Sequence, residues 1–176
     1  MTVVDVENLV FTFDNSVEPF QYEAAGTVVD GWPNGTKVAD VIANELPSPP
    51  AVTWLVEAKN FRVIHNPPKL ANIAGLAVTM MEKADGTIAG MIAVSAVSTD
   101  AAARAHATSA TQSAAHRVVL HLEPHPAGGG HSNLFPVNFS ANVWMKLKQL
   151  VSHIDPHPLV LSIASTQAAG VPWEVA

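Results

Sequence analysis

The chain has 176 residues, of which 48% are hydrophobic and 14% charged, so it fits one domain with a single substantial core. Its net charge of −6, with nine Lys and Arg, argues against a large nucleic-acid footprint, although a local groove can be basic on an acidic protein. The absence of cysteine excludes disulfides and thiolate chemistry, and no apolar run reaches the roughly 18 residues of a membrane span.

The first 35 residues predict only irregular structure and short strands. Leu9–Phe13 alternates in polarity like a strand, and residues 20–29 are a second candidate. Two more apolar strands are expected over 37–43 and 51–59. The loop between them, over 45–50, is rich in proline and cannot continue a central ladder.

The expected pairing of the two apolar strands places two acids opposite each other. If they pair symmetrically about the bond between Ser48 and Pro49, Asp40 lies opposite Glu57. Directly opposed residues of an antiparallel pair have Cβ atoms about 5 Å apart. Two carboxylates so placed repel each other unless a cation lies between them.

The remainder of the chain predicts helices and strands in alternation. A stripe of apolar residues at helical spacing indicates a helix over 70–81, which pauses at Asp85 and Gly86 and resumes over 88–92. The later elements are a helix from Thr99 to Thr111, a strand over 116–122, a glycine-rich loop over 124–133, a helix over 138–154 and a strand over 159–163. This order predicts a single mixed α/β domain over residues 1–176.

The acid pair and the lysine that follows it suggest phosphodiester chemistry. Asp40 and Glu57 are hard oxygen donors that suit Mg²⁺ or Mn²⁺, and the backbone carbonyl of Ala58 is a further candidate ligand. Such a metal polarises a phosphoryl oxygen and activates water. Lys59 lies on the same strand face as Glu57, about 7 Å along it, where it can orient the water or stabilise charge on the phosphate. The alternative is structural: Glu57 and Lys59 form a salt bridge and Asp40 makes one more ion pair.

The two strands carry a resemblance to a known family. The second of them reads Trp54-Leu55-Val56-Glu57-Ala58-Lys59-Asn60-Phe61-Arg62. With the segment around Asp40, it resembles the PD-(D/E)XK nuclease superfamily, and within it small bacterial members whose motif strand reads Trp-Leu-Ile-Glu-Val-Lys-Asp-Phe-Arg. The resemblance covers residues 37–62 and implies a restriction-endonuclease-like mixed central sheet flanked by helices. It also implies Mg²⁺-dependent cleavage of DNA, with Asp40 and Glu57 as metal ligands and Lys59 as the catalytic lysine.

Weaker matches and departures accompany this resemblance. Lys83 and Thr87, in the following helix, stand where such proteins often have polar residues. Many members add an acid from the N-terminal segment, for which Glu23 is the best-placed candidate and Glu18 the next. Ala39 replaces the proline of the nominal motif, and the helix after the motif has few basic residues.

Other interpretations stay open beside the nuclease. A protein of the same fold without activity would be a binding or assembly module, which the low charge and Ala-rich surface favour. A zinc site around His121, His125 and His131 matches no known spacing. We expect a cytoplasmic protein, since the N-terminus lacks the basic region of a signal peptide, and low surface charge makes a homodimer reasonable.

Overall fold

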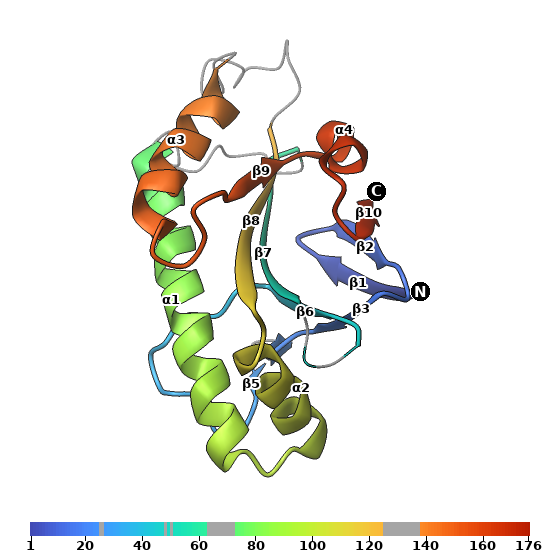
Figure 1. Ribbon diagram of the computed structural model, residues 1–176. Helices are drawn as coiled ribbons and strands as arrows, with labels where there is room; N and C mark the ends of the chain where they lie inside the picture. The colour runs from blue at the N-terminus through green and yellow to red at the C-terminus, as the bar shows by residue number, and fades with distance from the viewer. Residues whose placement is uncertain (25–26, 48, 50, 63–72, 125–137) are drawn as a thin grey trace.

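A five-stranded mixed sheet forms the centre of the molecule (Figure 1). The computed structural model describes residues 1–24, 27–47, 49, 51–62, 73–124 and 138–176. In spatial order the strands of the central sheet are β3 (Val17–Phe20), β6 (Val41–Glu45), β7 (Val52–Asn60), β8 (Ala115–Glu123) and β9 (Leu159–Leu161). β3, β6 and β7 pair antiparallel, whereas β7, β8 and β9 pair parallel. The predicted mixed α/β class is confirmed.

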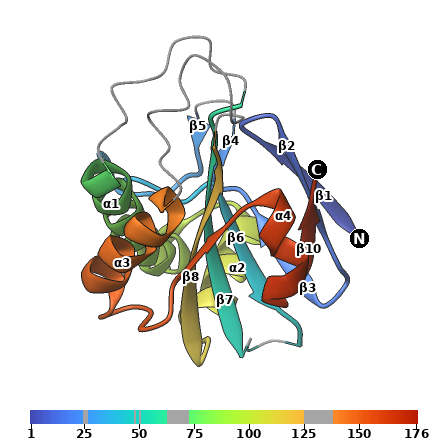
Figure 2. The same cartoon turned by 90° about the horizontal axis from the view of Figure 1, so that it is seen from above.

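The two faces of the central sheet are covered differently. Helices α1 (Ile73–Val97), α2 (Ala101–Thr111) and α3 (Phe139–Val151) pack on one face. The other face packs against a three-stranded sheet of β1 (Thr2–Val6), β2 (Leu9–Phe13) and β10 (Trp173–Val175). The short helix α4 (Ile163–Thr166) and a 3₁₀ turn, η2 (Gln167–Ala169), lie on this second side (Figure 2). The expectation of a sheet flanked by helices therefore holds for one face, while the other is covered mainly by a second sheet.

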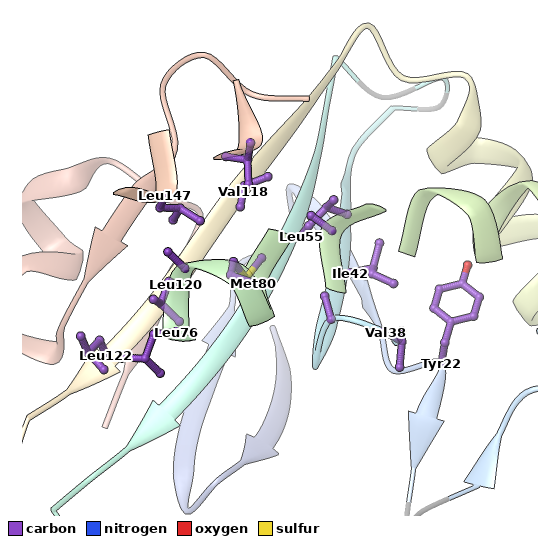
Figure 3. Packing of buried hydrophobic residues seen from close by; sticks show 14 of the residues in the cluster. Tyr22, Val38, Ile42, Leu55, Leu76, Met80, Val118, Leu120, Leu122 and Leu147 are labelled. Atoms are coloured by element: carbon purple, nitrogen blue, oxygen red, sulfur yellow. The ribbon is translucent and has the colours of Figure 1, made fainter. Parts of the chain in front are cut away.

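Successive side chains of β7 point to opposite faces of the central sheet, so this strand contributes to the packing on both faces. Leu55 points to the helices and belongs to the cluster around Met80 and Leu120 (Figure 3). Trp54 and Val56 point to the small sheet instead. A strand buried on both faces reads as a continuous apolar run, which is why this segment has no polar alternation before Glu57.

The register of β6 and β7 is the one expected from the proline loop. Val41 pairs with Val56 and Ile42 with Leu55, and continuing this ladder by one step sets Asp40 opposite Glu57. The strand itself begins at Val41 rather than at residue 37. The preceding residues do not pair in the ladder because they are bound to α1, where the amide of Ala39 donates to Thr87 Oγ1 at 2.8 Å.

Helix α1 runs without a break through the residues where an interruption was predicted. A Cβ atom on Gly86 would lie 2.3 Å from the carbonyl oxygen of Lys37, and one on Gly90 would lie 2.2 Å from the Trp32 ring. The glycines are therefore required for the close approach of the 32–40 segment to the helix, not for a turn in the chain.

Most other predicted elements are confirmed, namely β2, α2, β8, α3 and β9. The single strand expected over 20–29 is wrong, because the chain leaves the central sheet at Phe20 and forms a small hairpin of β4 (Glu23–Ala24) and β5 (Thr27–Val28). Among the described residues, no helix is long and apolar enough to cross a membrane.

Candidate active site at the end of strands β6 and β7

Four charged side chains from three elements meet at one end of the central sheet. Lys83 of α1 places its Nζ 3.0 Å from Asp40 Oδ1 and 2.6 Å from Glu57 Oε2. On the other side of Glu57, Oε1 lies 2.9 Å from Lys59 Nζ. The predicted trio of Asp40, Glu57 and Lys59 is thus brought together, and Lys83 bridges its two acids.

Glu57 is the most deeply buried member of the group. It is only 1% exposed, and burial, followed by repulsion from Asp40, raises the pKa of its carboxyl above the usual value against the opposing attraction of Lys59 and Lys83. Its Oε1 accepts no hydrogen bond of normal geometry from the described residues, although Lys59 is close. In the described part of the chain, this buried carboxylate thus has side-chain cations as its close partners.

Asp40 is held in place by the backbone. Its Oδ2 accepts a hydrogen bond of 2.9 Å from the amide of Ala58, while its Oδ1 faces Lys83. The anchoring of Ala39 to buried Thr87 fixes the backbone immediately before it. Ala58 therefore takes part in the site through its N–H; the predicted role of its carbonyl oxygen stays a prediction.

Lys59 has a second acidic neighbour that was not expected from the sequence. Glu7, in the turn between β1 and β2, places Oε1 3.3 Å from Lys59 Nζ, and its carbonyl oxygen accepts from Asn60 Nδ2. Burial lowers the pKa of the Lys59 ammonium, but Glu57, Asp40 and Glu7 together outweigh it, so the pKa is raised overall. Both Glu7 and Asn8 have positive φ, as is usual for the two central residues of a tight hairpin turn.

An open cleft of about 500 Å³ gives access to the group. Its lining residues come from the hairpin turn, the segment after β3, the segment before β6, strand β7 and helix α1; they are Val6, Glu7, Gln21, Glu23, Val38, Ala39, Asp40, Lys59 and Lys83. Glu23, the predicted additional acid, lines this cleft, whereas Glu18 lies away from it and its carbonyl oxygen is bonded to His106 Nε2. The charges that line the cleft are mixed, with three acids and two lysines.

The residues present fit a divalent cation in two respects. Asp40 and Glu57 are close enough for one ammonium to contact both, and the partners of Glu57 among the described residues are side-chain cations rather than backbone amides. Mg²⁺ is commonly bound by only one or two carboxylates together with water. No group of three or more His, Cys, Asp or Glu side chains in the described part of the chain is arranged to hold a metal. A cation here would therefore depend on this one pair of acids.

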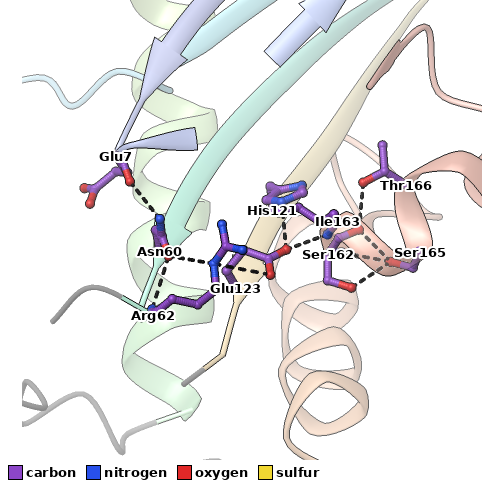
Figure 4. A network of polar contacts seen from close by, with 9 residues as sticks. All are labelled: Glu7, Asn60, Arg62, His121, Glu123, Ser162, Ile163, Ser165 and Thr166. Carbon is purple, nitrogen blue, oxygen red and sulfur yellow. Dashed lines mark hydrogen bonds and ion pairs between the residues drawn. The ribbon is translucent and has the colours of Figure 1, made fainter. Parts of the chain in front are cut away.

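A second polar cluster lies at the same end of strands β7 and β8, on the opposite face of the central sheet (Figure 4). Glu123 accepts from His121 Nε2 at 3.1 Å and from the amide of Ile163 at 2.5 Å. Arg62 is 3.9 Å from its other oxygen and also bonds to Asn60. Burial lowers the pKa of His121, whose Nδ1 has no partner in the described residues. The other two histidines of the suggested zinc group, His125 and His131, lie outside the described residues.

No family model matches the chain, and no match was found among the curated proteins or the solved structures. The resemblance to PD-(D/E)XK nucleases therefore depends on residues 37–62, on the polar positions of α1 and on the geometry that brings them together.

Proposed function

We propose that the protein is a metal-dependent nuclease of the PD-(D/E)XK type that hydrolyses phosphodiester bonds, with DNA as the expected substrate. The observation that carries the proposal is the closeness of two carboxylates, buried Glu57 and cleft-lining Asp40, which contact the same ammonium. Two neighbouring carboxylates repel each other unless a cation lies between them, and a divalent cation would take that place. The antiparallel β6–β7 pair followed by parallel β8 is compatible with a restriction-endonuclease-like core.

Each residue of the site has a role in this proposal. A bound Mg²⁺ or Mn²⁺ would supply Lewis-acid chemistry toward a phosphoryl oxygen and a water molecule. Asp40 and Glu57 would hold the ion, with the Ala58 carbonyl as a further ligand. Lys59 would stabilise the negative charge that develops on the phosphate oxygens and orient the water by donating a hydrogen bond.

One observation favours the alternative, a non-catalytic binding or assembly module. Lys83 forms an ion pair with each acid of the pair, and Glu57 and Lys59 form the ion pair that a purely structural site would have. Without a bound cation the acids around the cleft outnumber the lysines, which disfavours an approaching phosphate backbone. A binding module would function with these ion pairs intact, whereas a nuclease requires a divalent cation between Asp40 and Glu57.

Cleavage and metal binding separate the two functions. We expect the wild type to bind Mn²⁺ in a calorimetric titration and to cleave DNA in its presence. Asp40→Ala should bind no Mn²⁺, because one of two carboxylate ligands is lost. Lys59→Ala should still bind Mn²⁺ but cleave at least about a hundredfold more slowly, since transition-state stabilisation is removed.

Two exposed residues provide matched controls. Asp85→Ala removes an acid of α1 that is paired with His153 at the surface, and Lys37→Ala removes a lysine that is paired with Glu82. Both should bind Mn²⁺ and cleave like the wild type. Full cleavage by Lys59→Ala would contradict the catalytic role of Lys59, whereas no Mn²⁺ binding and no cleavage by the wild type would support the binding module.

A further inference from the structure

We propose that Lys83 is a built-in counter-ion, whose ammonium occupies the position of the divalent cation and leaves the two carboxylates when that cation binds. This inference rests on the proposed function, because it concerns the same pair of acids. It assigns to Lys83 a role distinct from that of Lys59, and it makes metal affinity a property that the chain itself limits.

The position of the Lys83 ammonium is the first argument. Nζ lies 3.0 Å from Asp40 Oδ1 and 2.6 Å from Glu57 Oε2, so it contacts one oxygen of each acid. These are the two side chains proposed to hold a metal. An ammonium and a divalent cation cannot share that place, because they would repel each other at short range. Binding of the cation therefore requires Lys83 to move.

The lysine side chain is able to make this movement. Its side chain is 19% exposed and forms part of the wall of the cleft. A lysine carries its charge on a flexible stem of four carbons, so the ammonium can turn into the cleft without displacement of α1. In contrast, Asp40 keeps a backbone donor, the amide of Ala58, and does not need Lys83 to stay in place.

The charge balance also allows the exchange. Four acids meet around the cleft, Glu7, Glu23, Asp40 and Glu57, against Lys59 and Lys83. The formal charge of the group is thus negative even with Lys83 bound between two of them. After the exchange, Lys83 faces the cleft as an unpaired cation, which is suited to a phosphate oxygen. One movement would therefore make the acidic cleft compatible with a phosphodiester.

The test is a comparison of Mn²⁺ affinities by calorimetry. Lys83→Met keeps much of the stem but has no ammonium to displace, so it should bind Mn²⁺ about tenfold or more tightly than the wild type. Lys83→Gln, which keeps a polar end, is a second variant in case the first does not fold. Lys37→Met, which removes a lysine from an exposed pair with Glu82, should bind like the wild type. Circular dichroism checks that each variant is folded.

A second measurement follows Lys83 directly. In the metal-free protein its ammonium protons should be visible by NMR, because two carboxylates protect them from exchange; the Lys83→Met spectrum assigns the signal. Saturating Mg²⁺ should remove that signal. A persistent signal, or Lys83→Met affinity equal to or below that of the wild type, would overturn the exchange and leave the metal site itself intact. Absence of Mn²⁺ binding in the wild type and in both Lys83 variants would overturn both proposals.

Discussion

Glu57 and Glu123 are buried acids on neighbouring strands, but their carboxylates have partners of different kinds. Glu57 points to the helical face, and its close partners among the described residues are the ammonium groups of Lys59 and Lys83. Glu123 points to the small sheet and accepts from a backbone amide and from His121. A carboxylate held by the backbone has fixed partners and stabilises the fold. One held by side-chain cations has partners that can move, which is what a binding site needs.

The largest effect should come from truncating each of these acids in turn. Glu123→Ala leaves the Ile163 amide and His121 without their acceptor, so the free energy of unfolding should fall by about 3 kcal/mol. Glu57→Ala should change the free energy of unfolding by less than about 1 kcal/mol, because Lys83 still forms its ion pair with Asp40 and Lys59 still forms its ion pair with Glu7. Denaturant unfolding of both variants, with Mn²⁺ titrations beside it, measures the contrast. Equal losses of stability would mean that Glu57 is a structural residue like Glu123.

Sequence reasoning finds the part of the site that is local. The Glu57 strand is predicted with nearly correct bounds because its apolar run is continuous, and the symmetry of the proline loop gives the right register for Asp40. Lys83 is noticed only through the resemblance. Its contact with both acids follows from the packing of α1 on the sheet, which no pattern near residue 57 specifies.

The parts that sequence reasoning misses depend on contacts between distant segments. Glu7 reaches Lys59 because the β1–β2 hairpin packs on the central sheet, and nothing in the local sequence indicates this. The strand β10 pairs with β2 from the other end of the chain, and a short C-terminal segment shows no strand periodicity. Gly86 suggests a break in α1 when read alone. The close approach of Lys37 explains the residue only once both segments are in place.

A third buried polar residue, His106, extends the comparison to pH. It is 3% exposed, with Nδ1 2.9 Å from the Tyr22 hydroxyl and Nε2 3.1 Å from the Glu18 carbonyl oxygen, so like Glu123 it has fixed partners. Burial lowers its pKa to about 4. Between pH 7 and pH 5, His106 therefore takes up a proton in the unfolded chain but stays neutral in the folded protein. The free energy of unfolding should fall by about 2 kcal/mol over this pH range.

The raised pKa of Glu57 has the opposite sign. A carboxyl that holds its proton more tightly in the folded state makes the fold less stable as pH rises above the ordinary pKa of a glutamate. Glu57 therefore cannot account for a loss of stability in acid. Thermal unfolding of His106→Gln across this pH range should show a weakened dependence. His153→Gln, at an exposed position, is the matched control for the substitution itself. An unaltered pH profile in His106→Gln would assign the acid sensitivity to another group.

A glycine substitution tests whether the site depends on the position of the segment that leads to Asp40. Gly86→Ala places a methyl group 2.3 Å from the Lys37 carbonyl oxygen, so the segment that leads to Asp40 must move. Since alanine also favours the helix by about 1 kcal/mol, the net loss of stability should be only about 1 kcal/mol. Mn²⁺ affinity should nevertheless fall several-fold, because Asp40 shifts relative to Glu57. Gly170→Ala is the matched control: its φ of 67° makes alanine costly by a similar amount, in open space away from the cleft. If both variants bind Mn²⁺ equally, general stability rather than the position of Asp40 governs the site, and the contrast between fixed and movable partners loses its support.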